Sequence, residues 1–221
     1  MKNKLKKQFA VIGLGRFGRS VAKSLFEMGY EVMGIDGKES MIQESISFVT
    51  HAIQADSTDE RALKELGIRN FDTVVVAIGE DIQASILTTL ILKQMEVPIV
   101  VVKAQNDLHG KVLYKIGADK VVFPERDMGL RVAHHLISPN IIDMIELSDN
   151  YSIVEVTAGR SMIGKSLKEL QVRAVFSCSV MAIKTGEHIN IAPLADDTIQ
   201  QNDVLVVIGK NADLQRFEES I

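Results

Sequence analysis

Short, nearly continuous apolar runs alternate in the first half of the chain with segments whose apolar residues recur every three or four positions. The runs are typical of strands buried on both faces, and the spaced segments are typical of helices. Strands are expected at 9–12, 31–35, 50–54, 72–78, 99–102 and 120–123. A helix with Val21, Leu25 and Met28 on one face follows the first strand, and others are expected at 38–47, 59–66, 82–95 and 106–116. This alternation predicts an α/β fold with a Rossmann-like, doubly wound parallel sheet.

The pattern changes after residue 125. Leu130, His134, Ile137, Ile141 and Ile145 recur at helical spacing, which favours one connecting helix with a break or kink at Pro139. Strands are then expected at 152–156, 179–184, 188–191 and 204–208, with a short helix at 166–170 and a terminal helix at 211–219. The expected organisation is a nucleotide-binding domain at 7–126, a crossover helix or linker at 127–148 and a small α+β domain at 149–221.

A glycine-rich turn, GLGRFG at 13–18, lies between the first expected strand and the first helix. Gly13 permits a tight turn, Gly15 permits close approach of a phosphate, and Gly18 permits close packing of the helix on the strand. Phe17 lies in the first turn of that helix, whose N-terminus offers unpaired N–H groups to phosphates. Strand, glycine turn, helix and strand together predict an adenine-nucleotide site.

Asp36 ends the second expected strand, where its carboxylate can accept hydrogen bonds from ribose hydroxyls. A carboxylate there repels a 2′-phosphate, so NADP is disfavoured, while NAD(H), ATP and ADP stay open. In a parallel sheet the ligand lies across the carboxyl ends of the strands. The candidates at those ends are Asp56, Ser57, Ala77, Gly79, Lys103 and Glu125. Asp56 and Ser57 fit either the adenosine side of a nucleotide or a helix cap.

Composition narrows the possible functions. The 221-residue chain is 46% hydrophobic and has a net charge of -4, which argues against binding to nucleic acid. A single cysteine, Cys178, excludes an internal disulfide and fits a reducing compartment. The sequence has no apolar stretch of membrane-spanning length, so a cytoplasmic protein is expected.

A catalytic constellation is not evident in the second half of the chain. His188 lies at an expected turn and Cys178 beside an apolar strand, and neither has a partner that would activate it. No enzyme activity is therefore expected. The alternatives are a small NAD-dependent oxidoreductase and a redox-sensing NAD-binding regulator.

Several stretches, taken in order, carry a resemblance to one family. They are QFAVIGLGRFG at 8–18, DIQAS at 81–85, KAQN at 103–106, KIGAD at 115–119, PERDM at 124–128 and VRA at 172–174. The sequence resembles Ktr-type regulatory subunits of bacterial potassium uptake, which belong to the RCK or TrkA family. The resemblance implies an N-terminal RCK domain, a crossover helix and a C-terminal RCK domain. It also implies a homo-octameric ring, built from dimers, that docks on a membrane potassium channel or transporter at the inner face of the membrane.

The resemblance also implies residue roles. Family members bind ATP, ADP or NAD(H) in the N-terminal cleft, with ATP favouring the conducting state and ADP the closed one. Arg16 matches a residue that reaches a terminal phosphate, and Glu125 matches a carboxylate that helps hold a cation between subunits. Relatives often carry other residues at positions 19 and 38, and here Lys38 could contact phosphate or ribose while Arg19 either adds positive charge near the phosphates or faces solvent.

A second ligand is implied for the C-terminal domain. Members of this group can bind cyclic di-AMP there at a dimer interface, which inactivates uptake. The positions that match such a pocket are Val172, Arg173, Ala174, Ile191 and Pro193. Arg173 can pair bidentately with a phosphate.

Overall fold

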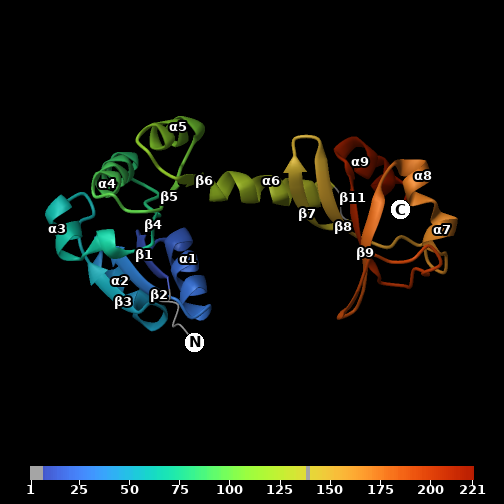
Figure 1. Cartoon of the computed structure of the whole chain (residues 1–221), viewed down its shortest axis with the longest axis horizontal. Helices are drawn as coiled ribbons and strands as arrows, with labels where there is room; N and C mark the ends of the chain where they lie inside the picture. The colour runs from blue at the N-terminus through green and yellow to red at the C-terminus, as the bar shows by residue number, and fades with distance from the viewer. Residues whose placement is uncertain (1–6, 138–139) are drawn as a thin grey trace. The chain divides into compact units, whose positions relative to one another are not determined.

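The computed structural model describes residues 7–137 and 140–221. The chain divides into two compact units, one ending at Arg126 and the other beginning at Asp127. Figure 1 draws the first unit in blue to green and the second in olive to red.

The first unit contains a six-stranded parallel sheet in the order β3-β2-β1-β4-β5-β6. Its strands are β1 (Gln8–Ile12), β2 (Glu31–Asp36), β3 (His51–Gln54), β4 (Thr73–Val76), β5 (Val100–Lys103) and β6 (Lys120–Val122). Its helices are α1 (Arg16–Glu27), α2 (Glu39–Ser45), α3 (Glu60–Glu65), α4 (Ile82–Gln94) and α5 (Asp107–Lys115), and α6 (Pro124–Ile137) begins at its end. The predicted Rossmann-like sheet is confirmed.

Apolar strand residues explain why both faces of this sheet are covered. Val74 and Val76 of β4 are fully buried in one cluster, and Val75 lies 6% exposed in a second cluster on the other face. Such a strand needs helices on both sides, which the parallel crossovers supply.

Polar residues begin the helices and glycines end two of them. The carboxylates of Asp59 and Asp81 and the amide oxygen of Asn106 accept N–H groups at the starts of α3, α4 and α5. Gly67 and Gly117 follow α3 and α5 with φ of 65° and 98°, a conformation that glycine adopts without strain.

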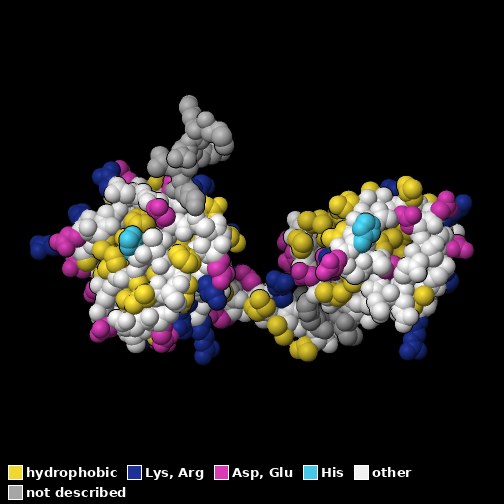
Figure 2. All heavy atoms as spheres, turned by 90° about the horizontal axis from the view of Figure 1, so that it is seen from below, with side chains coloured by type: hydrophobic (Ala, Val, Ile, Leu, Met, Phe, Trp, Pro, Cys, Tyr) yellow, Lys and Arg dark blue, Asp and Glu magenta, His cyan; other side chains and the backbone are white. Residues whose placement is uncertain are grey.

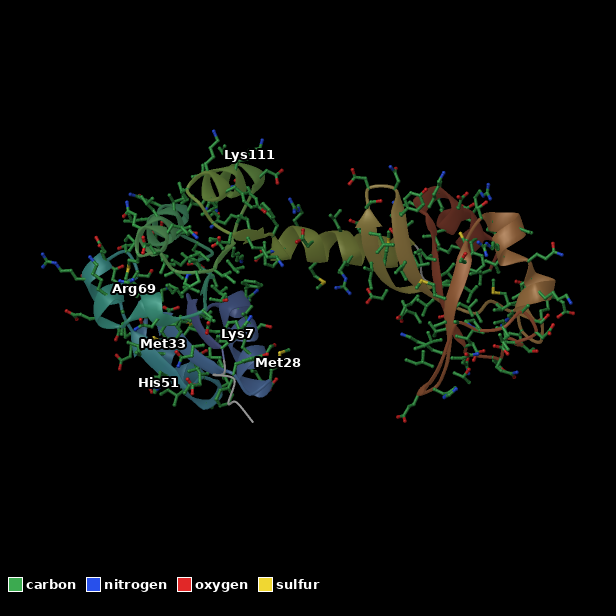
Figure 3. All side chains as sticks on the ribbon, in the orientation of Figure 1. Lys7, Met28, Met33, His51, Arg69 and Lys111 are labelled. Atoms are coloured by element: carbon green, nitrogen blue, oxygen red, sulfur yellow. The ribbon has the colours of Figure 1, made fainter. Side chains whose placement is uncertain are left out.

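Two expectations from the apolar spacing are wrong. Met28 does not face the core, because it follows the last residue of α1 and is 71% exposed (Figure 3). The expected connecting helix stops at Ile137, and Ile141–Ser148 forms a strand, β7. β7 pairs antiparallel with β8 (Tyr151–Thr157), which satisfies its backbone hydrogen bonds within a sheet instead of within a helix. The break expected at Pro139 lies outside the described residues.

The second unit contains a five-stranded antiparallel sheet in the order β10-β9-β11-β8-β7. The remaining elements are α7 (Leu167–Leu170), α8 (Val172–Phe176), β9 (Ser179–Thr185), β10 (His188–Ile191), β11 (Val204–Lys210) and α9 (Asn211–Glu219). Val154 and Val156 of β8 face its core together with Leu205 and Phe217. The expected small α+β domain is confirmed, with α8 as an additional helix.

Candidate functional site

The glycine turn between β1 and α1 depends on two of its glycines for packing. Gly13 has φ of 91° and donates its N–H to Ile35 O of β2 at 2.8 Å. A Cβ on Gly18 would lie 1.8 Å from Gly13 O, so a side chain there cannot be accommodated without moving the turn. These contacts hold the start of α1 against the carboxyl ends of β1 and β4.

Packing does not explain the third glycine of the turn, Gly15. A Cβ on Gly15 would meet no atom of the described residues within 4 Å, so packing against them does not require glycine there. Gly15 is the N-cap of α1, where no side chain caps the helix and no acidic residue lies in the first turn. The backbone therefore presents free N–H groups and a positive helix end beside open space, which fits a bound phosphate.

Asp36, the last residue of β2, connects this turn to the strand by a hydrogen bond. Its Oδ2 accepts the N–H of Leu14 at 2.7 Å, and its Oδ1 accepts the N–H of Lys38 at 2.8 Å. Each carboxylate oxygen keeps a second lone pair, so these bonds leave acceptor capacity for ribose hydroxyls. Lys38 is exposed beside this carboxylate, as the N-cap of α2.

A lysine lies at the carboxyl end of β5. Lys103, the last residue of β5, places its Nζ 2.5 Å from Glu125 Oε1 in the first turn of α6. The same Nζ lies 5.9 Å from the centre of the Phe17 ring and 3.4 Å from where a Cβ on Gly79 would stand. The hydrogen bond from Lys103 is the main reason that the pKa of Glu125 is lowered from its ordinary value. The structure thus brings together Phe17, Gly79, Lys103 and Glu125.

The other candidates at the strand ends have more local roles. Asp56 is exposed, and its Oδ1 accepts both the N–H and the hydroxyl of Thr58, which lowers its pKa. The Ser57 hydroxyl points inward and hydrogen-bonds to Thr88 Oγ1 of α4 at 2.9 Å. Ala77 is 5% exposed and packs against Gly13 and Gly18. Any nucleotide contact at Ser57 or Ala77 would therefore use the backbone.

The two arginines of the glycine turn differ. Arg16 begins α1 and is exposed. Arg19 forms an ion pair with Glu44 of α2, so its charge is already matched by a carboxylate of the same unit.

A metal at Glu125 would need further ligands. Within residues 7–137 and 140–221, no group of three or more His, Cys, Asp or Glu side chains could hold a metal ion. Glu125 therefore belongs to no such group among the described side chains.

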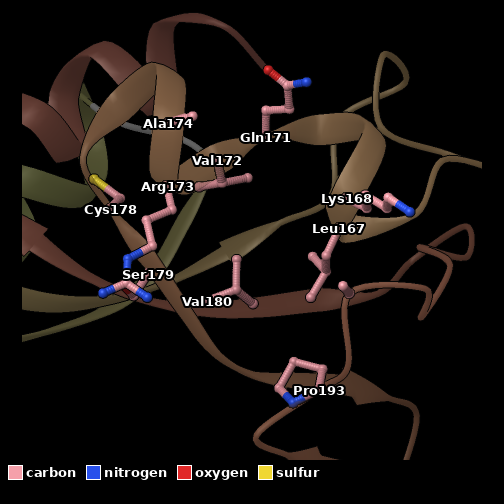
Figure 4. Close-up of a pocket in the computed structure, with 11 residues that line it drawn as sticks. Leu167, Lys168, Gln171, Val172, Arg173, Ala174, Cys178, Ser179, Val180 and Pro193 are labelled. Atoms are coloured by element: carbon pink, nitrogen blue, oxygen red, sulfur yellow. The ribbon is translucent and has the colours of Figure 1, made fainter.

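The second unit contains a pocket of about 400 Å³ between α7, α8 and β9 (Figure 4). Four of the five predicted effector positions line it, namely Val172, Arg173, Ala174 and Pro193. Figure 4 shows the Arg173 side chain reaching from α8 toward Ser179. Its guanidinium makes no ion pair within the part of the chain that the structure describes. Ile191 does not line the pocket and is 78% exposed.

The sequence did not indicate the rest of the lining. The additional residues are Leu167, Lys168, Gln171, Cys178, Ser179, Val180 and Ala195. The sequence feature that could have indicated this pocket is a pair of basic residues, Lys168 and Arg173, on consecutive short helices. Cys178 is fully buried, and burial raises the pKa of its thiol, so it contributes apolar surface and not a reactive group.

Comparison with known proteins agrees with this division of the chain. Residues 9–124 match the TrkA-N domain, and residues 151–221 match the TrkA-C domain. The sequence is 52% identical to the Ktr system potassium uptake protein C of Bacillus subtilis over 217 residues, which are 98% of each chain. The chain belongs to the Ktr-type regulatory subunits of the RCK, or TrkA, family. It is 50% identical to protein A of the B. subtilis Ktr system over 96% of each chain.

Solved structures support the fold. The GsuK RCK domain aligns with 96% of this chain, which spans 46% of that structure, at 23% identity and a TM-score of 0.56. Both B. subtilis relatives are named as potassium uptake proteins of the Ktr system, although the Rossmann-like fold is shared with oxidoreductases. Among the described helices, none has both the length and the apolarity needed to cross a bilayer.

Proposed function

We propose that this regulatory subunit of Ktr potassium uptake senses ATP and ADP, or alternatively NAD(H), on the glycine turn of its first unit. The observation that carries the proposal is the open space at Gly15, next to an uncapped helix N-terminus and framed by Asp36 and Lys103. Backbone N–H groups and the lysine would hold phosphates, and Asp36 would accept the ribose hydroxyls.

We also propose that the pocket of the second unit takes cyclic di-AMP. Arg173 supports this assignment, because a guanidinium that lines a cavity and forms no ion pair among the described residues suits a phosphate diester. The pocket is also lined by apolar side chains such as Val180 and Pro193, on which a base can pack.

The proposed partners are further copies of this chain, forming an octameric ring from dimers, and a membrane potassium channel or transporter. The chain would then be cytoplasmic and peripheral on the inner face of the membrane. Exposed apolar side chains on α6, such as Leu136 and Ile137 at 80% and 81% exposure, support assembly because such side chains are normally covered. Apolar side chains are visible in yellow on this segment in Figure 2. A cation at Glu125, completed by ligands from a neighbouring subunit or the nucleotide, belongs to the same proposal.

The test is a titration of the purified chain with ATP, ADP, NADH and cyclic di-AMP, with affinity and particle mass read together. Competitive binding of ATP and ADP to an octamer is the expected result. Gly15→Asp should abolish nucleotide binding, because its carboxylate would occupy the phosphate position, and should leave cyclic di-AMP binding unchanged. Binding of NAD(H) alone to a dimer would contradict the ring.

A further inference from the structure

The Lys103–Glu125 ion pair is asymmetric in exposure. The Lys103 side chain is 12% exposed, whereas that of Glu125 is 71% exposed. The ammonium is therefore held within the fold, while its carboxylate partner lies at the surface and can turn away into water at little cost.

Lys103 is also held next to the phosphate-binding turn. Its Nζ lies over the ring of Phe17, in the first turn of α1, and 3.4 Å from where a Cβ on Gly79 would stand. Helix start and ammonium both carry positive charge here. In the chain without ligand, Glu125 is the carboxylate that neutralises this ammonium.

We propose that Lys103 is an exchangeable cation, which pairs with Glu125 in the nucleotide-free chain and with a phosphate oxygen when a nucleotide occupies the glycine turn. The exchange releases the Glu125 carboxylate, so occupancy of the turn becomes a change of charge at the start of α6. This inference rests on the proposed nucleotide function. It adds a residue that converts binding into an electrostatic signal at the first turn of the helix that leaves the unit.

The experiment is calorimetric titration of the full chain with ATP in buffer containing EDTA, so that divalent cations do not contribute. Lys103→Met should weaken ATP binding about tenfold, because it removes a charge-assisted hydrogen bond. Lys103→Arg keeps the charge and should stay within about threefold of wild type. The matched control is Lys93→Met, since Lys93 forms a comparable pair with Asp119, with Nζ 2.9 Å from Oδ2, at the opposite end of β5. It should leave the affinity unchanged.

Glu125→Gln separates exchange from simple charge repulsion. It should tighten ATP binding in EDTA about threefold or more, because Lys103 no longer has to break an ion pair with a carboxylate before it pairs with the phosphate. In the Lys103→Met background the gain should shrink to the part that comes from repulsion between carboxylate and phosphate. Equal gains in both backgrounds, or unchanged affinity of Lys103→Met, would overturn the exchange while nucleotide binding by the wild type stands. Absence of binding by the wild type would instead overturn the proposed function, and the exchange with it.

Discussion

The carboxylate of Asp36 joins two strand ends by accepting the backbone N–H of Leu14 at 2.7 Å. Its second oxygen accepts the N–H of Lys38, so one side chain satisfies backbone donors of both the glycine turn and the start of α2. Asp36 therefore supports the shape of the turn before any ligand is bound.

Asp36→Ala should lower the free energy of unfolding by about 1–3 kcal/mol, because it removes the charged acceptor of the partly buried Leu14 N–H and of the exposed Lys38 N–H. Equilibrium urea unfolding measures the change. Asp56→Ala is the matched control: Asp56 also follows a strand, but it is exposed, and among the described residues its carboxylate bonds only to Thr58, two residues away. We expect a loss below about 1 kcal/mol for the control. Equal losses would show that Asp36 has no special part in holding the turn.

Gly15→Ala and Gly18→Ala should have opposite consequences. A methyl group on Gly15 meets no atom of the described chain, so the midpoint of thermal unfolding should stay close to wild type while ATP affinity falls at least about tenfold. A methyl group on Gly18 collides with Gly13 O, which should cost about 1–3 kcal/mol of stability or more. Thermal unfolding and ATP titration of both variants measure these effects. Unchanged ATP affinity in a folded Gly15→Ala variant would remove the glycine turn from the binding site.

The sequence was sufficient for the first unit because its signals agree. The valine run of β4 can only be a strand covered on both faces, and Asp81 and Gly117 mark helix ends by ordinary capping chemistry. The glycine turn was recognisable because Gly13 and Gly18 are fixed by local geometry.

The errors have equally local causes. Ile141 and Ile145 lie four residues apart, a spacing that suits a helix as well as the alternate positions of a strand, and only pairing with β8 decides between them. The short helix α8 is capped by Gln171 and Ser177, which have positive φ values of 47° and 57° although neither is a glycine. The inward direction of Ser57 depends on Thr88, which is distant in sequence.

The Lys103–Glu125 pair predicts how acid affects stability. The pKa of Glu125 is lowered from 4.5 chiefly by its hydrogen bond from Lys103, so the pair stabilises the fold above pH 4.5 and this contribution is lost as the pH falls through the lowered pKa. Since the Glu125 side chain is 71% exposed, the contribution should be below about 1 kcal/mol. The thermal unfolding midpoint of Glu125→Gln should therefore lie slightly below that of wild type at neutral pH. In strong acid the two midpoints should be equal. Glu65→Gln, at an exposed site of α3 without an ion pair in the described chain, is the control and should show no such convergence.

Of the predicted effector positions, Arg173 lines the pocket and Ile191 does not. Arg173→Ala should weaken cyclic di-AMP binding about tenfold or more, because it removes the guanidinium that lines the cavity. Ile191→Ala should leave the affinity unchanged within the single chain, because Ile191 does not line the pocket. Both side chains lie at the surface, so neither change should lower the unfolding midpoint of the second unit. Calorimetry on the two variants decides the matter: loss of affinity in Ile191→Ala would mean that the ligand extends beyond this pocket onto β10, the position expected if a second copy of the chain completes the site.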